Sequence, residues 1–246
     1  MFTLLSKLFR RSDRETHPYC SAIVAAAGSS SRMEGENKLL LPLEDVPVLV
    51  RSLLALNAAR LVDEIVVATR EQDLLAVGDL CKIYDISKPV KIVLGGDTRM
   101  ESVYQASLAC REEARFLAVH DGARPLAEPE LIDRVIALAH RTNAAAPAVP
   151  VKDTIKLVEN DVVAATPDRT ALRAIQTPQV FDAQIFRAAL QSAVETGAQV
   201  TDDCSVMERI GKEIFLTEGS YENIKITTPE DMLLAAAILQ RREELL

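Results

Sequence analysis

The stretch Ser21-Ala-Ile-Val-Ala-Ala-Ala27-Gly28-Ser29-Ser30-Ser31-Arg32-Met33 joins a short apolar run to a turn of small polar residues. The apolar run has the length of a strand that is covered on both faces, as in a parallel sheet. Three further runs of this kind follow, at residues 64–69, 91–94 and 116–120, with helix-like segments between them. Strands that alternate with helices predict an α/β fold with a mostly parallel sheet and helices on both faces.

Further elements follow from the same periodicities. We expect helices at residues 48–59, 72–81, 100–112, 130–141, 183–196 and 229–244, and strands at 145–151 and 213–217. Pro229 suits the first turn of the last helix, and Glu230 and Asp231 suit the positive end of its dipole. We also interpret residues 223–229, around Lys225, as a late strand.

Residues 154–166 break this alternation, because two β-prone runs flank Asn160-Asp161. The pattern predicts a β-hairpin that projects from the sheet. Since a two-stranded hairpin is rarely stable by itself, we expect it to pack on another surface, such as a second copy of the chain. The predicted organisation is an extension at residues 1–20 and one domain at residues 21–246, with a β-arm at residues 152–170.

The composition excludes several classes of protein. With 246 residues, 48% of them hydrophobic and 26% charged, the chain can bury a full core. Its net charge of −8 and pI near 5.1 argue against a nucleic-acid partner. The four cysteines form no C-x-x-C pair, and no apolar run reaches the roughly 18–20 residues of a membrane-spanning helix. We therefore expect a soluble, cytoplasmic protein.

Residues 1–20 are expected to be a flexible extension. Phe2, Leu5 and Phe9 could share a helix face opposite Lys7 and Arg10, but no clean apolar segment of a signal peptide follows the charges. We expect no stable membrane association and assign this extension no function.

The turn after the first strand has the composition of a phosphate-binding loop. Glycine and serine let backbone N–H groups converge on phosphate oxygens, and Arg32 and Lys38 can add positive charge. The turn has neither the G-x-G-x-x-G spacing of dinucleotide folds nor the G-K-[ST] ending of a P-loop. An ordinary serine-rich turn with surface cations is the alternative.

Three later stretches place polar residues near strand ends. Gly95-Gly96-Asp97 follows the third strand, and a glycine pair permits close approach of a flat ligand. His120-Asp121-Gly122-Ala123-Arg124 follows the fourth strand and puts a carboxylate and a guanidinium at the same edge. Lys225 lies in the late segment. The structural alternatives are a cap or turn role for Asp121 and a solvated edge lysine for Lys225.

Together these stretches resemble the cytidylyltransferases that join CTP to a sugar-alcohol phosphate. The matching segments run from about residue 22 to residue 234: AAGSSSRM with NK, GGDTRMESV, VHDGARP, VPVKDTIK, DRTALRAIQTPQ, TDDCS and GSYENIKITTPEDM. Their order and spacing identify the chain as similar to this family throughout. Two departures are Ser30, where a second glycine is usual, and the step from Arg32 to Lys38, which is one residue shorter than expected.

The resemblance implies a Rossmann-like nucleotide-binding sheet and a homodimer that exchanges its β-arms. It is closest to the branch that transfers CMP from CTP to 2-C-methyl-D-erythritol 4-phosphate, which gives 4-diphosphocytidyl-2-C-methyl-D-erythritol and pyrophosphate in the non-mevalonate isoprenoid pathway. In this reaction the acceptor phosphate attacks the α-phosphate in line, so catalysis depends on positioning and charge neutralisation. Mg²⁺ or another divalent cation is the expected cofactor.

The resemblance also implies roles for single residues. Catalytic roles fall to Arg32, Lys38, Lys225 and Arg169. CTP contacts are expected from Ala26, Ala27, Gly28, Ser29, Ser30, Gly96, Asp97, Ser102 and Asp121. Contacts with the acceptor are expected from Asp121, Arg124, Thr154, Lys156, Arg169 and Thr177, and Asp121 is the candidate metal ligand.

Two other functions stay open at this point. A D-ribitol-5-phosphate cytidylyltransferase would share the fold and differ mainly in its acceptor. A non-catalytic nucleotide-binding protein of the same fold would have lost its cations, whereas Arg32, Lys38, Arg169 and Lys225 are all present. The cationic set favours an enzyme.

Overall fold

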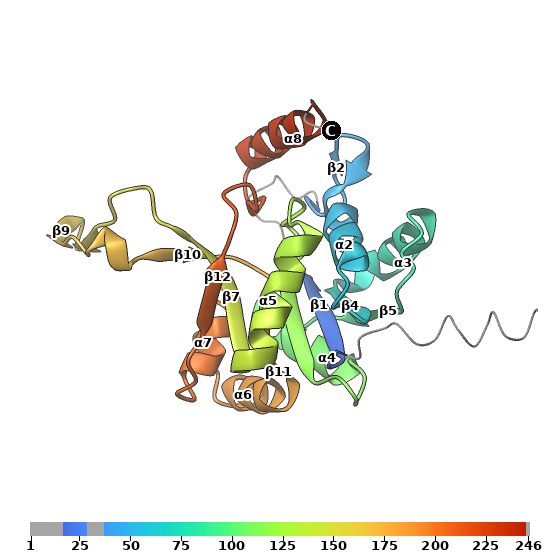
Figure 1. Ribbon diagram of the computed structural model, residues 1–246, viewed down its shortest axis with the longest axis horizontal. Helices are drawn as coiled ribbons and strands as arrows, with labels where there is room; N and C mark the ends of the chain where they lie inside the picture. The colour runs from blue at the N-terminus through green and yellow to red at the C-terminus, as the bar shows by residue number, and fades with distance from the viewer. Residues whose placement is uncertain (1–16, 29–36, 245–246) are drawn as a thin grey trace, which may run out of the picture.

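A mixed β-sheet forms the centre of the computed structural model, which describes residues 17–28 and 37–244 (Figure 1). In these residues, eight strands form one sheet in the order β10-β7-β11-β6-β1-β4-β5, with β12 paired to β7. The parallel part consists of β6 (Phe116–Asp121), β1 (Cys20–Ala26), β4 (Glu64–Thr69) and β5 (Val90–Leu94). The expected α/β fold with a mostly parallel sheet is confirmed.

Helices cover both faces of this sheet, as Figure 1 shows. Side chains of α2 (Val48–Ala58), α3 (Leu74–Ile83), α5 (Pro129–Thr142) and α8 (Pro229–Glu244) join one buried cluster. Those of α4 (Arg99–Ala109), α6 (Ala183–Glu195) and α7 (Asp203–Glu208) join the other. Alternate residues of β1 enter different clusters, because successive side chains of a strand point to opposite faces.

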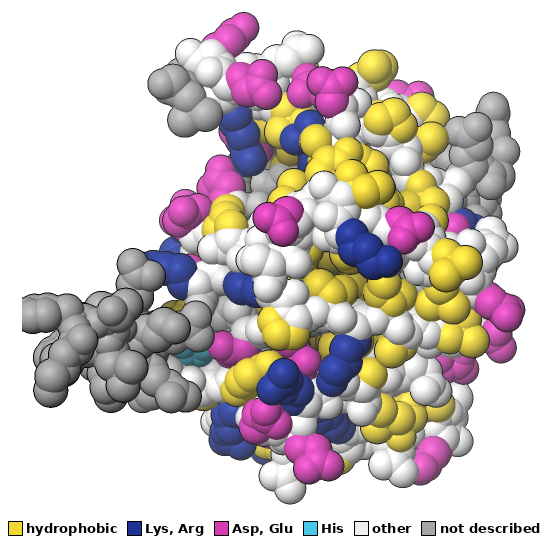
Figure 2. All heavy atoms as spheres, turned by 90° about the vertical axis from the view of Figure 1, so that its right-hand side faces the viewer, with side chains coloured by type: hydrophobic (Ala, Val, Ile, Leu, Met, Phe, Trp, Pro, Cys, Tyr) yellow, Lys and Arg dark blue, Asp and Glu magenta, His cyan; other side chains and the backbone are white. Residues whose placement is uncertain are grey.

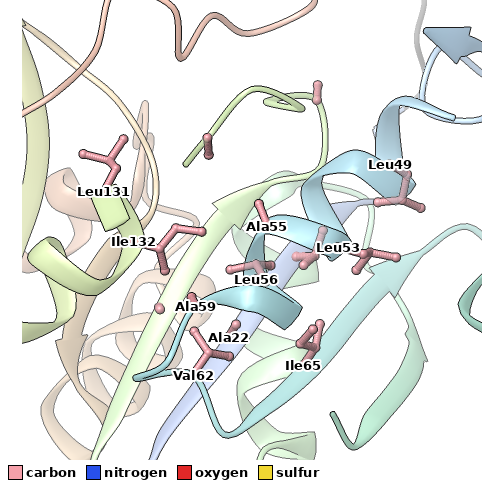
Figure 3. Close-up of a cluster of buried hydrophobic side chains, with 14 of the residues drawn as sticks. Ala22, Leu49, Leu53, Ala55, Leu56, Ala59, Val62, Ile65, Leu131 and Ile132 are labelled. Carbon is pink, nitrogen blue, oxygen red and sulfur yellow. The ribbon is translucent and has the colours of Figure 1, made fainter. Parts of the chain in front are cut away.

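The packing of α2 on the sheet explains the apolar pattern of that helix. Figure 3 shows Leu49, Leu53 and Leu56 on the side of α2 that faces Ala22 of β1 and Ile65 of β4. The spacing of these leucines places them on one helix face, and each is at most 1% exposed. Burial of each leucine contributes about 1.5–3 kcal/mol.

The ends of two helices follow from local chemistry. Pro129 occupies the first turn of α5, and Asn143 ends that helix in the left-handed region, with φ of 65°. Before α8, the Asp231 carboxylate accepts the N–H groups of Thr227 and Thr228 at 2.7 and 2.8 Å. The predicted start of the last helix at Pro229 is confirmed.

The other side of the sheet contains elements that the sequence did not predict. β11 (Gln179–Asp182) lies antiparallel between β6 and β7 (Ala144–Pro150), and β10 (Arg173–Ile175) is antiparallel to β7. β11, β10 and α7 are too short for their periodicity to be recognised. β12 (Phe215–Glu218) pairs with β7 in parallel, close to the expected strand at 213–217. A 3₁₀ turn, η1 (Glu71–Asp73), precedes α3.

The interpretation of residues 223–229 as a strand is wrong, because residues 223–228 pair with no strand and Pro229 already begins α8. Its N–H groups have other acceptors. Asn223 bonds to the Ser220 carbonyl, Ile226 bonds to the Ala123 carbonyl at 2.8 Å, and Thr227 bonds to Asp231. The segment is therefore fixed by single contacts rather than by a ladder.

Residues 154–166 contain an antiparallel hairpin of β8 (Leu157–Glu159) and β9 (Val162–Ala165), which projects away from the sheet in Figure 1. Asn160 and Asp161 form its turn with φ of 49° and 62°, the left-handed geometry of a two-residue hairpin loop. All residues of both strands are exposed. A much smaller hairpin, β2 (Pro42–Leu43) with β3 (Val46–Pro47), precedes α2.

The surface in Figure 2 carries hydrophobic side chains interspersed with Lys, Arg, Asp and Glu. In the part of the chain that the structure describes, no helix combines the length and the apolar character needed to cross a membrane. The expectations for the N-terminal extension fall mostly on residues 1–16, which lie outside the described residues.

Candidate active site

The loops that follow β1, β5 and β6 begin at one edge of the sheet. The three strands belong to one parallel run, so their carboxyl ends share that edge, where open α/β sheets bind ligands. Gly122 after β6 donates its N–H to the Ala25 carbonyl of β1 at 3.1 Å. This bond fixes the exit of β6 against the end of β1.

The first loop is described only in part. Ala26 is buried, Ala27 is half-buried, and Gly28 has open space where a Cβ would lie. Ser29, Ser30 and Arg32 lie outside the described residues. Lys38 is half-buried between Asn37, whose amide donates to Asp73 at 3.0 Å, and the buried Leu39. These two neighbours fix where the backbone of Lys38 lies.

The loop after β5 packs tightly against the first loop. A Cβ on Gly95 would lie 2.5 Å from the Ala27 Cβ, and a Cβ on Gly96 would lie 2.4 Å from the Glu101 Cβ. Gly96 donates its N–H to the hydroxyl of Ser102 at 3.1 Å, and this hydroxyl donates to the Thr98 carbonyl at 2.8 Å. The buried Ser102 thus shapes the loop.

This loop also presents polar groups beside its backbone. Asp97 is exposed next to the glycine pair. Thr98 and Glu101 form a capping box that starts α4, which holds the end of the loop. A backbone shaped in this way offers N–H and C=O groups to a flat ligand.

Asp121 is the centre of a charged cluster at the end of β6. It is 6% exposed, and three cations surround it. Lys225 Nζ lies 2.8 Å from Oδ2, Arg99 Nη2 lies 3.0 Å from Oδ1, and Arg124 Nε lies 3.7 Å from Oδ2. Burial by itself would raise the pKa of Asp121, but the cations hold it well below its usual range. Asp121 is therefore ionised at every pH at which the protein is expected to work.

Sequence reasoning assigned no role to Arg99 or to its second partner, Asp203. Arg99 Nη2 lies 2.8 Å from Asp203 Oδ2, so one guanidinium bridges two carboxylates. Burial opposes charge on Arg99, but Asp203 and Asp121 raise its pKa. The only available signal was that both residues lie in stretches of the family pattern, GGDTRMESV and TDDCS.

A buried polar network of Thr177 and His120 fixes the backbone of Asp121. The Asp121 N–H donates to the Thr177 hydroxyl at 3.0 Å, and this hydroxyl lies 3.1 Å from His120 Nδ1. Nε2 of the ring lies 3.3 Å from the Arg124 carbonyl, which can only accept a hydrogen bond, so the ring proton is assigned to Nε2 and Nδ1 accepts from the Thr177 hydroxyl. Complete burial lowers the pKa of His120 to about 4, so the ring is neutral at pH 7.

The same network reaches the segment that carries Lys225. Asn223 donates its amide to the Thr177 carbonyl at 3.0 Å, and Arg124 donates to the Asn223 carbonyl at 2.7 Å. Thr177 is only 3% exposed and its hydroxyl is already engaged. The structure therefore brings Asp121, Arg124, Thr177 and Lys225 together, although they come from three distant parts of the chain.

The remaining predicted residues lie on the arm. Arg169 belongs to a 3₁₀ turn, η2 (Arg169–Ala171), and donates to the Lys152 carbonyl at 2.9 Å. It lines a shallow hollow with Pro150, Val151, Lys152, Thr170 and Arg173. Lys156 donates to Thr166 at 2.7 Å, and Thr154 is exposed. Within the described part of one chain, no hydrogen bond or ion pair joins the arm to Asp121.

The fit of a divalent cation can be judged from the carboxylates. Among residues 17–28 and 37–244, no group of three or more His, Cys, Asp or Glu side chains could hold a metal ion. Asp121 offers one carboxylate, and its oxygens are paired with cations. The residues thus fit a cation that takes most of its ligands from a phosphate ligand and water.

Comparisons of the whole chain agree with the geometry of this edge. Residues 20–241 match the family model described as "IspD: 2-C-methyl-D-erythritol 4-phosphate cytidylyltransferase". A relative of that name from Bacillus cytotoxicus is 45% identical over 223 residues, which cover 89% of this chain and 98% of the relative. Another from Desulforamulus reducens is 44% identical and covers 90% and 96%.

Solved structures give the same result. The 4-diphosphocytidyl-2C-methyl-D-erythritol synthase of Anaerococcus prevotii superimposes with a TM-score of 0.82 at 32% identity, covering 90% of this chain and 96% of that one. The 2-C-methyl-D-erythritol 4-phosphate cytidylyltransferase of Thermus thermophilus gives 0.73 at 29% identity, covering 90% and 99%.

Proposed function

The chain belongs to the 2-C-methyl-D-erythritol 4-phosphate cytidylyltransferase family, and from this premise we propose how its residues perform the reaction. It is a nucleotidyltransferase that moves CMP from CTP to 2-C-methyl-D-erythritol 4-phosphate in isoprenoid synthesis. The products are 4-diphosphocytidyl-2-C-methyl-D-erythritol and pyrophosphate. The observation that carries the proposed mechanism is the buried Asp121, which holds Lys225 and two arginines at the sheet edge.

The reaction is a direct displacement. A phosphate oxygen of the acceptor forms a bond to the α-phosphorus of CTP, and the bond from that phosphorus to the leaving pyrophosphate breaks. One bond forms and one breaks, so the protein supplies neither a nucleophile nor a base. Its task is to align two anions and to offset the charge that develops on the phosphorus.

Lys225 suits this task. Its ammonium is held by Asp121 at 2.8 Å, yet its side chain is 40% exposed and open to a ligand. We assign Arg32 and Lys38 of the first loop to the same phosphates. The described cluster of Arg99, Arg124 and Lys225 with Asp121 and Asp203 has three positive and two negative charges. This excess of positive charge supports a triphosphate site.

A divalent cation such as Mg²⁺ would offset part of the triphosphate charge. We assign its protein ligand to Asp121, with phosphate oxygens and water as its other ligands. Asp121 can serve only if Lys225 turns from Oδ2 toward the phosphates, and the exposure of Lys225 allows this movement.

We assign the cytosine ring to the loop after β5. Gly96 and Asp97 would offer an acceptor and a donor to the exocyclic amine and ring carbonyl, while Ser102 holds the loop in shape. Ala26, Ala27 and Gly28 would border the triphosphate with Ser29 and Ser30. The close contact between Gly95 and Ala27 supports one continuous nucleotide site.

We propose that the chain acts as a homodimer whose arms complete the acceptor sites. The apolar side chains of Leu157, Val158, Val162 and Val163 on the hairpin are 55%, 56%, 67% and 56% exposed, which calls for a covering surface. Arg169, with Thr154 and Lys156, would bind the acceptor phosphate of the partner's site. In this arrangement residues 21–246 form one domain with the arm at 152–170, and the enzyme is cytoplasmic.

Pyrophosphate release tests the proposed function. The protein is incubated with CTP and Mg²⁺ and either 2-C-methyl-D-erythritol 4-phosphate or D-ribitol 5-phosphate. Release with the first acceptor alone is expected. Release with the second alone would move the enzyme to polyol-phosphate activation, and no release with either would support a non-catalytic nucleotide-binding protein.

Mixed dimers test the exchange of arms. Lys38→Ala and Arg169→Ala each disable a different part of the same site, so a heterodimer has one site that contains both intact residues if the arm comes from the partner. Activity should therefore rise when the two inactive variants are mixed and allowed to exchange. A heterodimer with Arg134→Ala, on the exposed face of α5, in place of Arg169→Ala serves as control. No recovery in isolated heterodimers would exclude exchanged arms.

A further inference from the structure

Asp203 is a buried carboxylate to which the proposed mechanism assigns no contact with a ligand. It is 1% exposed, and the guanidinium of Arg99 is the cation beside it, at 2.8 Å. A buried charge of this kind costs several kcal/mol of desolvation unless it is paired. Asp203 therefore needs Arg99 as its partner. In turn, Asp203 holds one end of a guanidinium that also contacts Asp121.

The backbone around Asp203 is fixed independently of Arg99. Asp202 caps α7 by accepting the Ser205 N–H at 3.0 Å, and Gln179 of β11 holds the same turn. The Gln179 amide donates to Asp202 at 2.8 Å and accepts from the Cys204 N–H at 2.9 Å. Since β11 pairs with β6, Asp203 is anchored to the strand next to the one that carries Asp121.

Arg99 is fixed from the other direction. It is the first residue of α4, directly after the Thr98 cap and the loop that we assign to cytosine. Its Nε and Nη2 both lie near Asp121 Oδ1, at 3.1 and 3.0 Å, while Nη2 also contacts Asp203. Arg99 thus occupies Oδ1, and Oδ2 is left for Lys225 and Arg124.

We propose that Asp203 is a positioning residue for the reaction: it holds the Arg99 guanidinium on Asp121 Oδ1 and so keeps Oδ2 and Lys225 aligned for the nucleotide. Without the Asp203 charge, Arg99 is free to turn toward Oδ2 or toward the triphosphate. It would then compete with Lys225 in the step where charge develops on the phosphorus. The effect should appear in kcat more than in the KM of the acceptor, whose phosphate we assign to Arg169, Thr154 and Lys156 of the arm.

The inference rests on the proposed function and is tested by kinetics of Asp203→Asn, which keeps the shape and an acceptor oxygen but removes the charge. We expect kcat to fall about tenfold, the effect typical of a residue that orients a side chain which itself contacts the ligand. The KM of the acceptor should change less than about twofold. The matched control is Glu208→Gln, which removes the charge of an exposed carboxylate on the same helix, α7. Its kcat should stay at the wild-type value.

A double variant shows whether Asp203 acts through Arg99. Arg99→Gln should lower kcat at least as much as Asp203→Asn, and Arg99→Gln with Asp203→Asn should be no slower than Arg99→Gln alone. The inference would be overturned if the double variant lost kcat by the product of the two single losses, or if Asp203→Asn had the kcat of the wild type. Should Asp203→Asn fail to fold, Arg99→Lys decides. Lysine keeps the charge but has no second N–H group to replace Nε, which lies 3.1 Å from Asp121 Oδ1, so an unchanged kcat would refute the role. An inactive wild-type enzyme would instead refute the proposed function.

Discussion

The buried His120 should make stability depend on pH in a defined window. Its pKa is about 4 in the folded chain, against an ordinary 6.5, because burial opposes the charged ring. Between these two pH values the unfolded chain binds more protons, so unfolding becomes easier as the pH falls through 6.5 toward 4. A shift of this size corresponds to about 3 kcal/mol of stability that is present at pH 7 and lost by pH 4.

The assay is urea denaturation of the wild type and of His120→Gln at several pH values from 7 to 4. Glutamine does not titrate, so the difference in unfolding free energy between the two proteins should shrink by about 3 kcal/mol across that range. His140→Gln is the comparison, because His140 is only half-buried although burial also lowers its pKa. A difference for His120→Gln that changes by less than about 1 kcal/mol would show that the ring is not held neutral.

Three substitutions test other parts of the site. Gly95→Ala should lower the free energy of unfolding by about 1–3 kcal/mol, because its Cβ would lie 2.5 Å from the Ala27 Cβ. Gly28→Ala is the control, since its Cβ would meet nothing within 4 Å. Equal melting temperatures of these two variants would contradict the close packing of the two loops. Lys225→Met should reduce kcat roughly 10²-fold in the pyrophosphate assay, the loss that follows removal of a donor to the developing charge, and an unchanged kcat would remove Lys225 from the mechanism. Arg169→Ala should raise the KM of the acceptor while that of CTP stays near normal; equal weakening of both would move Arg169 to the nucleotide.

The sequence predicted most of the sheet correctly for a physical reason. Strands β1, β4 and β6 are covered on both faces, so they read as continuous apolar runs that differ from amphipathic helices such as α5. The same expectation for residues 91–94 is wrong, because β5 lies at the edge of the sheet and has no buried residue. Strand ends then predict where polar residues gather. Gly96 and Asp121 were expected at a common edge by this argument, and both lie there. Sequence reasoning missed β10, β11 and α7, whose few residues carry no periodicity.

Less of the site than of the fold could be predicted from the sequence. Thr177 was expected to contact the acceptor, and the structure shows its hydroxyl engaged with Asp121 and His120. Lys225 was expected on a strand, and the structure holds it on a non-paired segment beside Asp121. In both cases the residue was recognised, but its partners lie in distant parts of the chain, and a local pattern does not encode them.

The sequence by itself determined the main alternation of strands and helices, the edge at which the ligand loops meet and the turn of the hairpin at Asn160-Asp161, because burial periodicity and turn chemistry act over a few neighbouring residues. Only the tertiary structure decided that Arg99 joins Asp121 to Asp203. Arg99 and Asp203 are 104 positions apart. They meet because α7 is held to β11 while α4 begins beside the end of β5. Such a pair depends on how whole elements pack, and no local propensity specifies it.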